Sequence, residues 1–113
     1  NQDDHVKNIA FLMNKQGQWS LAPAYDLTYS FNPSGAWTST HQMTLNGKRE
    51  HFTMEDFRTC AQVSQMMRGR ADTIIDEVRS AIVRWPEFAD RTRIRPGWLS
   101  DIQNNQRLEF PPS

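Results

Sequence analysis

The sequence predicts an α+β fold that is predominantly helical, in which two short β-hairpins precede a helical bundle. Two observations predict this order. Short apolar runs separated by turn residues occupy the first half of the chain, and apolar residues at spacings of three and four occupy the second half. The 113 residues suffice for one domain, or part of one, with a modest core.

The first predicted hairpin joins an apolar run from Ile9 to Met13 to a second strand from Gln18 to Leu21. The connection ends in Gly17, which can take a positive φ, and Trp19 adds strand character. We expect the first strand to enter the core. The hairpin also returns the chain towards its start, so that residues 25–27 can lie beside the first eight residues.

A loop and a second short hairpin are predicted for the next segment. Residues 28–42 are rich in Ser and Thr and contain the turn sequence Asn-Pro-Ser-Gly. Residues 43–45 then run into Asn46 and Gly47, a pair typical of a type I′ turn.

Three helices are predicted after residue 52. The first opens with a capping box from Thr53 to Asp56, preceded by the apolar staple residue Phe52, and should end at Gly69. One face of this helix would carry Phe57, Cys60, Ala61, Ser64 and Met67.

The second predicted helix has the clearest pattern, which runs from Ala71 to Trp85 and should end at Pro86. The third should open near Pro96, and Pro111 and Pro112 close the chain. We expect three apolar residues of the third helix to face inward: Trp98, Leu99 and Ile102.

Composition excludes several classes of protein. Thirteen basic and thirteen acidic side chains cancel, so no strong nonspecific attraction to DNA or an anionic membrane is implied. The single cysteine, Cys60, excludes an internal disulfide framework and a cysteine-rich zinc site. No apolar run is long enough for a membrane span and no secretory signal is visible, so a cytoplasmic setting is expected.

The chemistry is predicted for the first eight residues together with Asp26. Asp3 and Asn8 are five positions apart, the spacing of the catalytic Asp and the metal-binding Asn in a protein-kinase catalytic loop. Kinases place a second metal carboxylate after a short hairpin, and Asp26 matches that place. Magnesium favours such sparse oxygen donors, completed by phosphates and water.

The whole string resembles the HipA family of toxin Ser/Thr kinases. It stands here as Asp-Asp-His-Val-Lys-Asn over residues 3–8 and Leu-Ala-Pro-Ala-Tyr-Asp over residues 21–26. The hairpin at 43–48 and the Phe-Thr that opens the first helix also resemble this family. The resemblance implies part of a protein-kinase-like C-terminal lobe. It covers residues 1–60, and the helix pattern beyond is unspecific.

The resemblance implies a role for each matching residue. Asp3 would be the catalytic aspartate that orients or deprotonates the target hydroxyl, with His5 in support. Asn8 and Asp26 would hold magnesium, and Lys7 belongs to the nucleotide-binding string without an assigned task. Asp4 occupies a variable place in that string and is expected to be structural.

The resemblance also implies cofactors, partners and a context. ATP would be the phosphate donor with Mg²⁺, in a bacterial type II toxin–antitoxin system. The partners would be a HipB-like helix-turn-helix antitoxin, through which DNA is reached indirectly, and a protein substrate, in some members a tRNA synthetase.

The chain itself carries no glycine-rich phosphate-covering loop, because its five glycines are scattered singly. We therefore expect a C-terminal fragment of a larger kinase that is inactive by itself. It divides into catalytic and metal-binding loops (1–27), a loop with the second hairpin (28–52) and a helical part (53–113).

Other interpretations stay open. The histidines at positions 5, 41 and 51 could join Asp3 or Asp4 in another metal site, although no zinc spacing is present. A catalytic Ser-His-Asp triad is also conceivable, but the chain has no G-x-S-x-G nucleophile elbow.

Trp37 is either a lid over its loop or a partner contact. The arginines at 68–70 and 91–95 form either a solvated face or a contact with nucleic acid or antitoxin. The alternative function is a noncatalytic binding or regulatory module derived from a kinase lobe.

Overall fold

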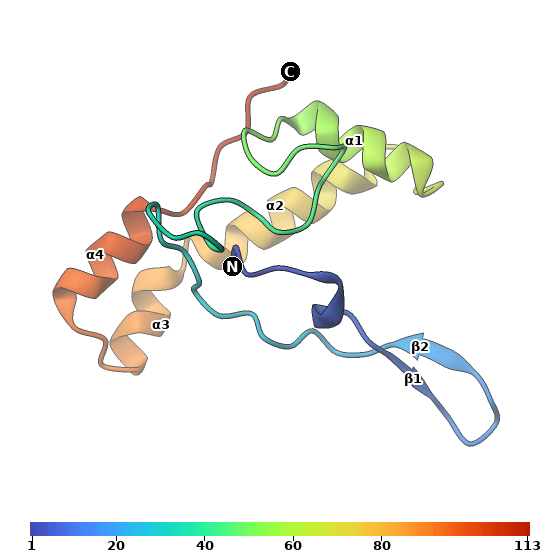
Figure 1. The fold of residues 1–113 in the computed structure, drawn as a ribbon, viewed down its shortest axis with the longest axis horizontal. Helices are drawn as coiled ribbons and strands as arrows, with labels where there is room; N and C mark the ends of the chain where they lie inside the picture. The colour runs from blue at the N-terminus through green and yellow to red at the C-terminus, as the bar shows by residue number, and fades with distance from the viewer. The chain divides into compact units, whose positions relative to one another are not determined.

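The computed structural model describes all residues, Asn1–Ser113, which form two compact units (Figure 1). The first unit is Asn1–Glu50 and contains the strands. The second is His51–Ser113 and contains the α-helices. The predicted order of strands first and helices second, an α+β and mostly helical fold, is therefore confirmed.

The first hairpin forms as predicted. Strand β1 (Phe11–Met13) pairs antiparallel with β2 (Trp19–Leu21). In the turn between them, Asn14 Oδ1 accepts hydrogen bonds from the backbone N–H groups of residues 16 and 18, both at 2.9 Å. Gly17 has φ +78°, the left-handed region in which glycine meets no Cβ penalty.

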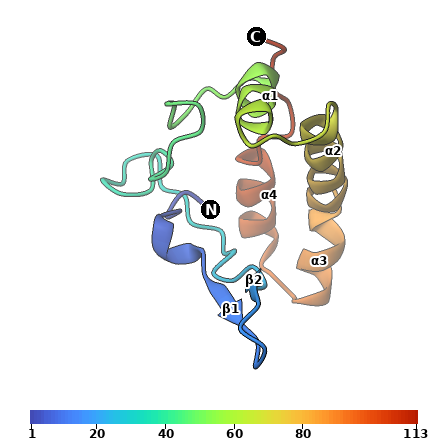
Figure 2. The same ribbon diagram turned by 90° about the vertical axis from the view of Figure 1, so that its right-hand side faces the viewer.

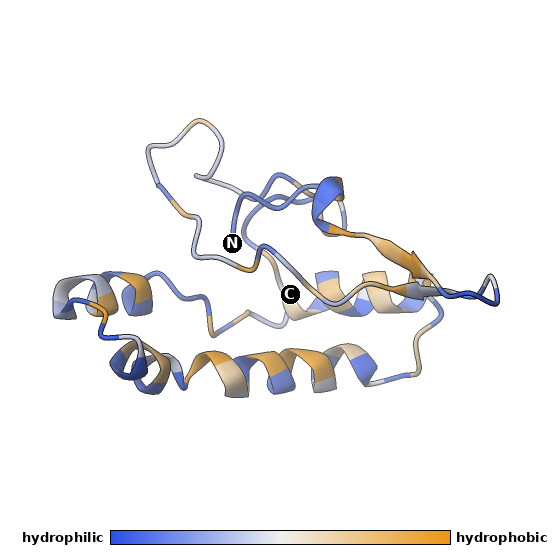
Figure 3. Ribbon diagram, turned by 90° about the horizontal axis from the view of Figure 1, so that it is seen from below, coloured by the Kyte–Doolittle hydropathy of each residue, from blue (hydrophilic) through white to orange (hydrophobic).

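The expectation that this strand enters a core is wrong. Phe11 is 62% exposed, and every residue of both strands is exposed. Figure 3 shows β1 in the hydrophobic colour and the turn that follows it in the hydrophilic colour. The register places four large apolar side chains on one face, because residues two apart and residues paired across strands point the same way. These four are Phe11, Met13, Trp19 and Leu21.

The rest of the first unit is irregular, as predicted for residues 28–42. The second hairpin is reduced to one bridge between Leu45 and Lys48. Its turn residues, Asn46 and Gly47, have φ values of 52° and 78°. Positive φ at both central positions defines the predicted type I′ turn.

Helix α1 (Met54–Val63) begins with the predicted capping box. The backbone N–H and hydroxyl of Thr53 donate to Asp56 Oδ2 at 2.8 and 2.9 Å, and the Asp56 N–H returns a bond to Thr53 Oγ1 at 3.3 Å. Phe52 lies with its ring 6.2 Å from that of Phe57, which confirms the apolar staple. Chain-end carbonyls complete the cap, since Pro111 O accepts from the Met54 N–H at 2.8 Å.

The predicted end of this helix at Gly69 is wrong. The helix ends at Val63 because Gln65 takes a left-handed conformation with φ 55°. The N–H of Met66 then bonds to Ala61 O at 2.9 Å, and that of Gln65 to Gln62 O at 3.0 Å. This pair of bonds is a Schellman motif, formed without the usual glycine. Ser64 and Met67 therefore lie outside the helix.

The predicted second helix is two helices. Helix α2 (Arg70–Ile82) starts after Gly69, and α3 (Trp85–Arg91) follows it, so that Pro86 begins a helix instead of ending one. Proline is tolerated in the first helical turn, where its missing N–H has no intrahelical partner to lose. Helix α1 packs against α2, and α3 packs against α4, which spans Pro96–Asn104 (Figure 2).

Helix α4 (Pro96–Asn104) forms where predicted. Leu99 and Ile102 are half-buried, but Trp98 is 66% exposed, so its inward orientation was wrongly predicted. The only buried apolar residues are three alanines: Ala61, Ala71 and Ala89. None of the helices combines the length and apolarity needed to cross a membrane.

Candidate functional site

The first eight residues form a tight turn held by side-chain amides. The side-chain oxygen of Asn1 accepts the Asp3 N–H at 2.9 Å. A short 3₁₀ turn follows over Val6–Asn8, and Asn8 Oδ1 accepts the His5 N–H at 2.9 Å. Asn and Asp side chains commonly close turns in this way, so the sequence dictates much of this local structure.

The hairpin brings residues 25 and 26 back to this turn. Asn8 Nδ2 donates to Asp26 Oδ2 at 2.9 Å, and Asn1 Nδ2 donates to the Asp26 carbonyl at 2.6 Å. The Tyr25 hydroxyl donates to the Lys7 carbonyl at 2.6 Å. Two of the predicted site residues, Asn8 and Asp26, are therefore in direct contact.

Asp26 adopts an unusual backbone conformation. Its φ is 56°, in the left-handed region, which aspartate adopts more readily than most L-residues but less readily than glycine. The hydrogen bonds from Asn1 and Asn8 hold the residue in this conformation. Backbone strain of this kind persists where surrounding contacts over-determine it.

The side chains of the other predicted site residues differ in exposure and in hydrogen bonding. The carboxylate of Asp3 is exposed and accepts no hydrogen bond in the structure, so it is free to meet a substrate. The ammonium group of Lys7 is likewise exposed and unpaired. Nδ1 of His5 is buried without a partner, which leaves Nε2 as the ring nitrogen that can contact a ligand.

Asp4 has a different environment from Asp3. Its Oδ1 accepts the Gln42 N–H at 2.8 Å, and its Oδ2 lies 3.1 Å from His41 Nδ1. This carboxylate therefore links the first eight residues (the octet) to the segment at His41, 37 positions away, which is the structural role expected for it. The alternative metal site formed by the three histidines with Asp3 or Asp4 has no support, because no three His, Cys, Asp or Glu side chains are placed to hold an ion.

The residues present are suitable for magnesium. Asn8 and Asp26 offer an amide and a carboxylate in contact, and Asp26 Oδ1 has no hydrogen-bond partner. Asn8 Oδ1 accepts the His5 N–H and keeps a second lone pair. Two hard oxygen donors match the way magnesium is held beside substrate phosphates and water.

A comparison with protein-family models shows the family of this chain. The family model described as the HipA-like C-terminal domain matches residues 1–85. The chain belongs to this family. The match includes the octet and Asp26, and it extends the HipA-like region through α2 beyond the residues in which the sequence motifs lie. No curated protein and no solved structure was found to match the chain.

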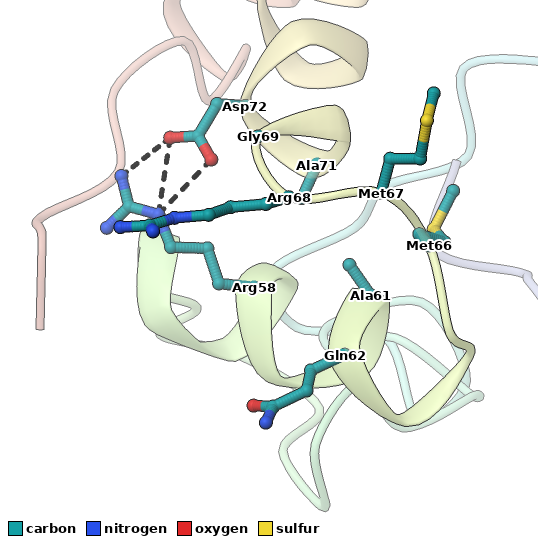
Figure 4. Close-up of a pocket in the computed structure, with 9 residues that line it drawn as sticks. All are labelled: Arg58, Ala61, Gln62, Met66, Met67, Arg68, Gly69, Ala71 and Asp72. Carbon is teal, nitrogen blue, oxygen red and sulfur yellow. Dashed lines mark hydrogen bonds and ion pairs between the residues drawn. The ribbon is translucent and has the colours of Figure 1, made fainter.

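The helical unit of this HipA-like chain holds a cavity of about 680 Å³ between α1 and α2 (Figure 4). Arg58 donates to both carboxylate oxygens of Asp72, from Nε at 3.2 Å and from the terminal nitrogen at 2.6 Å. These hydrogen bonds lower the pKa of the Asp72 carboxyl and raise that of Arg58. The cavity lining consists of Arg58, Ala61, Gln62, Met66, Met67, Arg68, Gly69, Ala71 and Asp72.

Two contributors to the site were missed at the sequence level. The Asn1 side chain donates from the octet to the Asp26 carbonyl, and the Tyr25 hydroxyl donates in the other direction, to the Lys7 carbonyl of the octet. Asn1 lies two positions before Asp3, a spacing typical of an Asx turn, so part of its role was visible in the sequence. The hydrogen bond from Asn1 to the Asp26 carbonyl was not visible in the sequence, because it depends on the path of the hairpin.

Proposed function

We propose that the full-length protein containing this chain is an ATP-dependent Ser/Thr protein kinase, the toxin of a bacterial type II toxin–antitoxin system. It would transfer the γ-phosphate of ATP to a protein hydroxyl in the cytoplasm. The observation that carries this proposal is the contact between Asn8 and Asp26, because it assembles a magnesium-type donor pair from two distant motifs. Membership of the HipA-like family supports it.

Each residue of the site would have one task. Asp3, with its free carboxylate, orients the target hydroxyl or accepts its proton. Asn8 and Asp26 hold the magnesium, which when bound offsets the charge of the nucleotide phosphates. His5 supports the transferred phosphate through its accessible ring nitrogen. Lys7, which matches the family's nucleotide-binding string, would contribute positive charge toward the nucleotide.

The proposed partners follow from the family. They are a HipB-like helix-turn-helix antitoxin, which would connect the complex to DNA, and a protein substrate such as a tRNA synthetase. The isolated chain should neither bind ATP tightly nor transfer phosphate, because it has no glycine-rich loop to cover the phosphates.

Phosphotransfer by the full-length protein tests the proposal. Asp3→Ala and Asp26→Asn should each lower kcat at least about 100-fold, since each removes a group that acts in the transition state. Asp76→Asn is the matched control, because this exposed carboxylate lies on α2. An Asp26→Asn variant as active as the control would remove Asp26 from the magnesium role.

A second candidate is a noncatalytic binding module. The four large apolar side chains on one face of the hairpin favour it, since exposed apolar patches often mark interaction surfaces. A wild-type full-length protein that binds magnesium and ATP but transfers no phosphate to any protein would support this candidate over the kinase.

A further inference from the structure

We infer that Asn1 is a positioning residue that places Asp26 for metal binding; this inference rests on the proposed magnesium role of Asp26. The Asn1 side chain uses both ends of its amide. Oδ1 accepts the Asp3 N–H at 2.9 Å, and Nδ2 donates to the Asp26 carbonyl at 2.6 Å. One planar amide group therefore fixes the distance between the backbone of Asp3, the proposed catalytic residue, and the backbone of Asp26, the proposed metal ligand.

The conformation of Asp26 explains why such a link is needed. Its φ of 56° lies in the left-handed region, which is less favourable for an aspartate than the right-handed or extended regions. The segment that carries it is exposed and lies outside any helix or strand, so no ladder of backbone hydrogen bonds holds it. The bond from Asn1 is made to the Asp26 backbone, and it fixes the carbonyl without using the carboxylate.

The other two hydrogen bonds between the octet and this segment involve different groups. Asn8 bonds to the Asp26 carboxylate, which a metal would also occupy. The Tyr25 hydroxyl bonds to Lys7 O and leaves Asp26 itself untouched. Asn1 is thus the residue whose side chain joins Asp3 to Asp26 while leaving both carboxylates available.

Divalent-ion affinity of the full-length protein tests this inference directly. We would titrate Mn²⁺, a paramagnetic substitute for Mg²⁺, and follow it by electron paramagnetic resonance. Asn1→Ala should weaken binding about 10-fold, the lower end of the loss seen when an outer-shell partner of a metal ligand is removed. Asn1→Asp keeps the acceptor for the Asp3 N–H but loses the donor to Asp26, so it should weaken binding at least as much.

Asn14→Ala is the matched control. Asn14 also closes a turn in the same unit with its side-chain amide, but at the tip of the hairpin, and this variant should bind Mn²⁺ like the wild type. Backbone NMR chemical shifts without metal give a second readout. In Asn1→Ala and Asn1→Asp, the shifts of residues 25–27 should change because the hydrogen bond to the Asp26 carbonyl is lost, whereas in Asn14→Ala they should keep the wild-type values.

The outcomes separate this inference from the proposed function. If Asp26→Asn abolishes Mn²⁺ binding while both Asn1 variants bind like Asn14→Ala, the role of Asn1 is refuted and the metal site stands. If Asn1→Asp binds normally and only Asn1→Ala is impaired, Asn1 merely closes the Asp3 turn. If Asp26→Asn binds Mn²⁺ normally, the metal site itself is wrong, and the role of Asn1 falls with it.

Discussion

The side chains of Asn8 and Asp26 meet at 2.9 Å although 18 positions separate them in the chain. The amide nitrogen of Asn8 faces the carboxylate, and its oxygen is held by the His5 N–H. The metal-free pair is therefore closed by a hydrogen bond between an uncharged donor and a charged acceptor. Replacing the Asn8 amide nitrogen by an oxygen adds a negative charge next to the Asp26 carboxylate without changing the size or shape of the side chain.

Asn8→Asp should make the protein less stable without metal and more dependent on it. The substitution keeps an acceptor for the His5 N–H but sets two carboxylates against each other, a repulsion of about 1 kcal/mol at 4 Å in water. Thermal unfolding with and without Mg²⁺ measures the effect. The Mg²⁺-induced rise in Tm should exceed that of the wild type, and an equal rise would show that the pair does not bind the ion.

Asp56→Ala should destabilise the helical unit by about 1–2 kcal/mol through loss of the capping box. Asp56 is only 2% exposed, and its carboxylate accepts two hydrogen bonds from Thr53. Urea denaturation provides the measurement. Glu55→Ala, in the same helical turn but exposed, is the control and should change stability by less than about 0.5 kcal/mol.

The ion pair between Arg58 and Asp72 should make stability depend on pH in the acid range. Hydrogen bonding by Arg58 lowers the pKa of Asp72 below its usual 3.8. As the pH falls, the Asp72 carboxylate is therefore protonated in the unfolded state before it is protonated in the folded state. The stabilisation is therefore present in full above the unfolded value and is lost as the pH falls through the lower folded value.

Comparison of Asp72→Asn with the wild type isolates this effect. The difference between their urea midpoints should be constant from pH 5 to 7, and it should shrink as the pH falls below about 4. Because both side chains are exposed, high salt should also reduce it. A difference that grows with acid would contradict the assigned direction.

Gly69→Ala should cost about 1 kcal/mol for a purely conformational reason. Gly69 precedes α2 with φ +82°, and a Cβ there would contact nothing within 4 Å. Gly97, inside α4, is equally open but has no positive φ, so Gly97→Ala should be neutral or stabilising by up to about 1 kcal/mol. Equal effects of the two substitutions in chemical denaturation would contradict this assignment.

The sequence predicted local structure correctly where that structure depends on residues that are neighbours in the chain. The hairpin turn at Gly17, the type I′ turn at Asn46 and the capping box at Thr53 are all short-range hydrogen-bonding patterns. The prediction of helix ends was less successful. Gln65 closes α1 in a conformation that only its backbone bonds reveal, and Pro86 is compatible with either the end or the start of a helix.

By itself the sequence determined the order of hairpins and helices, the turns, and the choice of Asp3, Asn8 and Asp26 as candidates, because spacing and residue type act over a few positions. Tertiary structure alone decided which of these groups meet. Contact between Asn8 and Asp26, and between Asp4 and His41, depends on the path of the intervening chain. It also decided that Trp98 and the apolar hairpin are exposed, since burial depends on neighbours that no local pattern specifies.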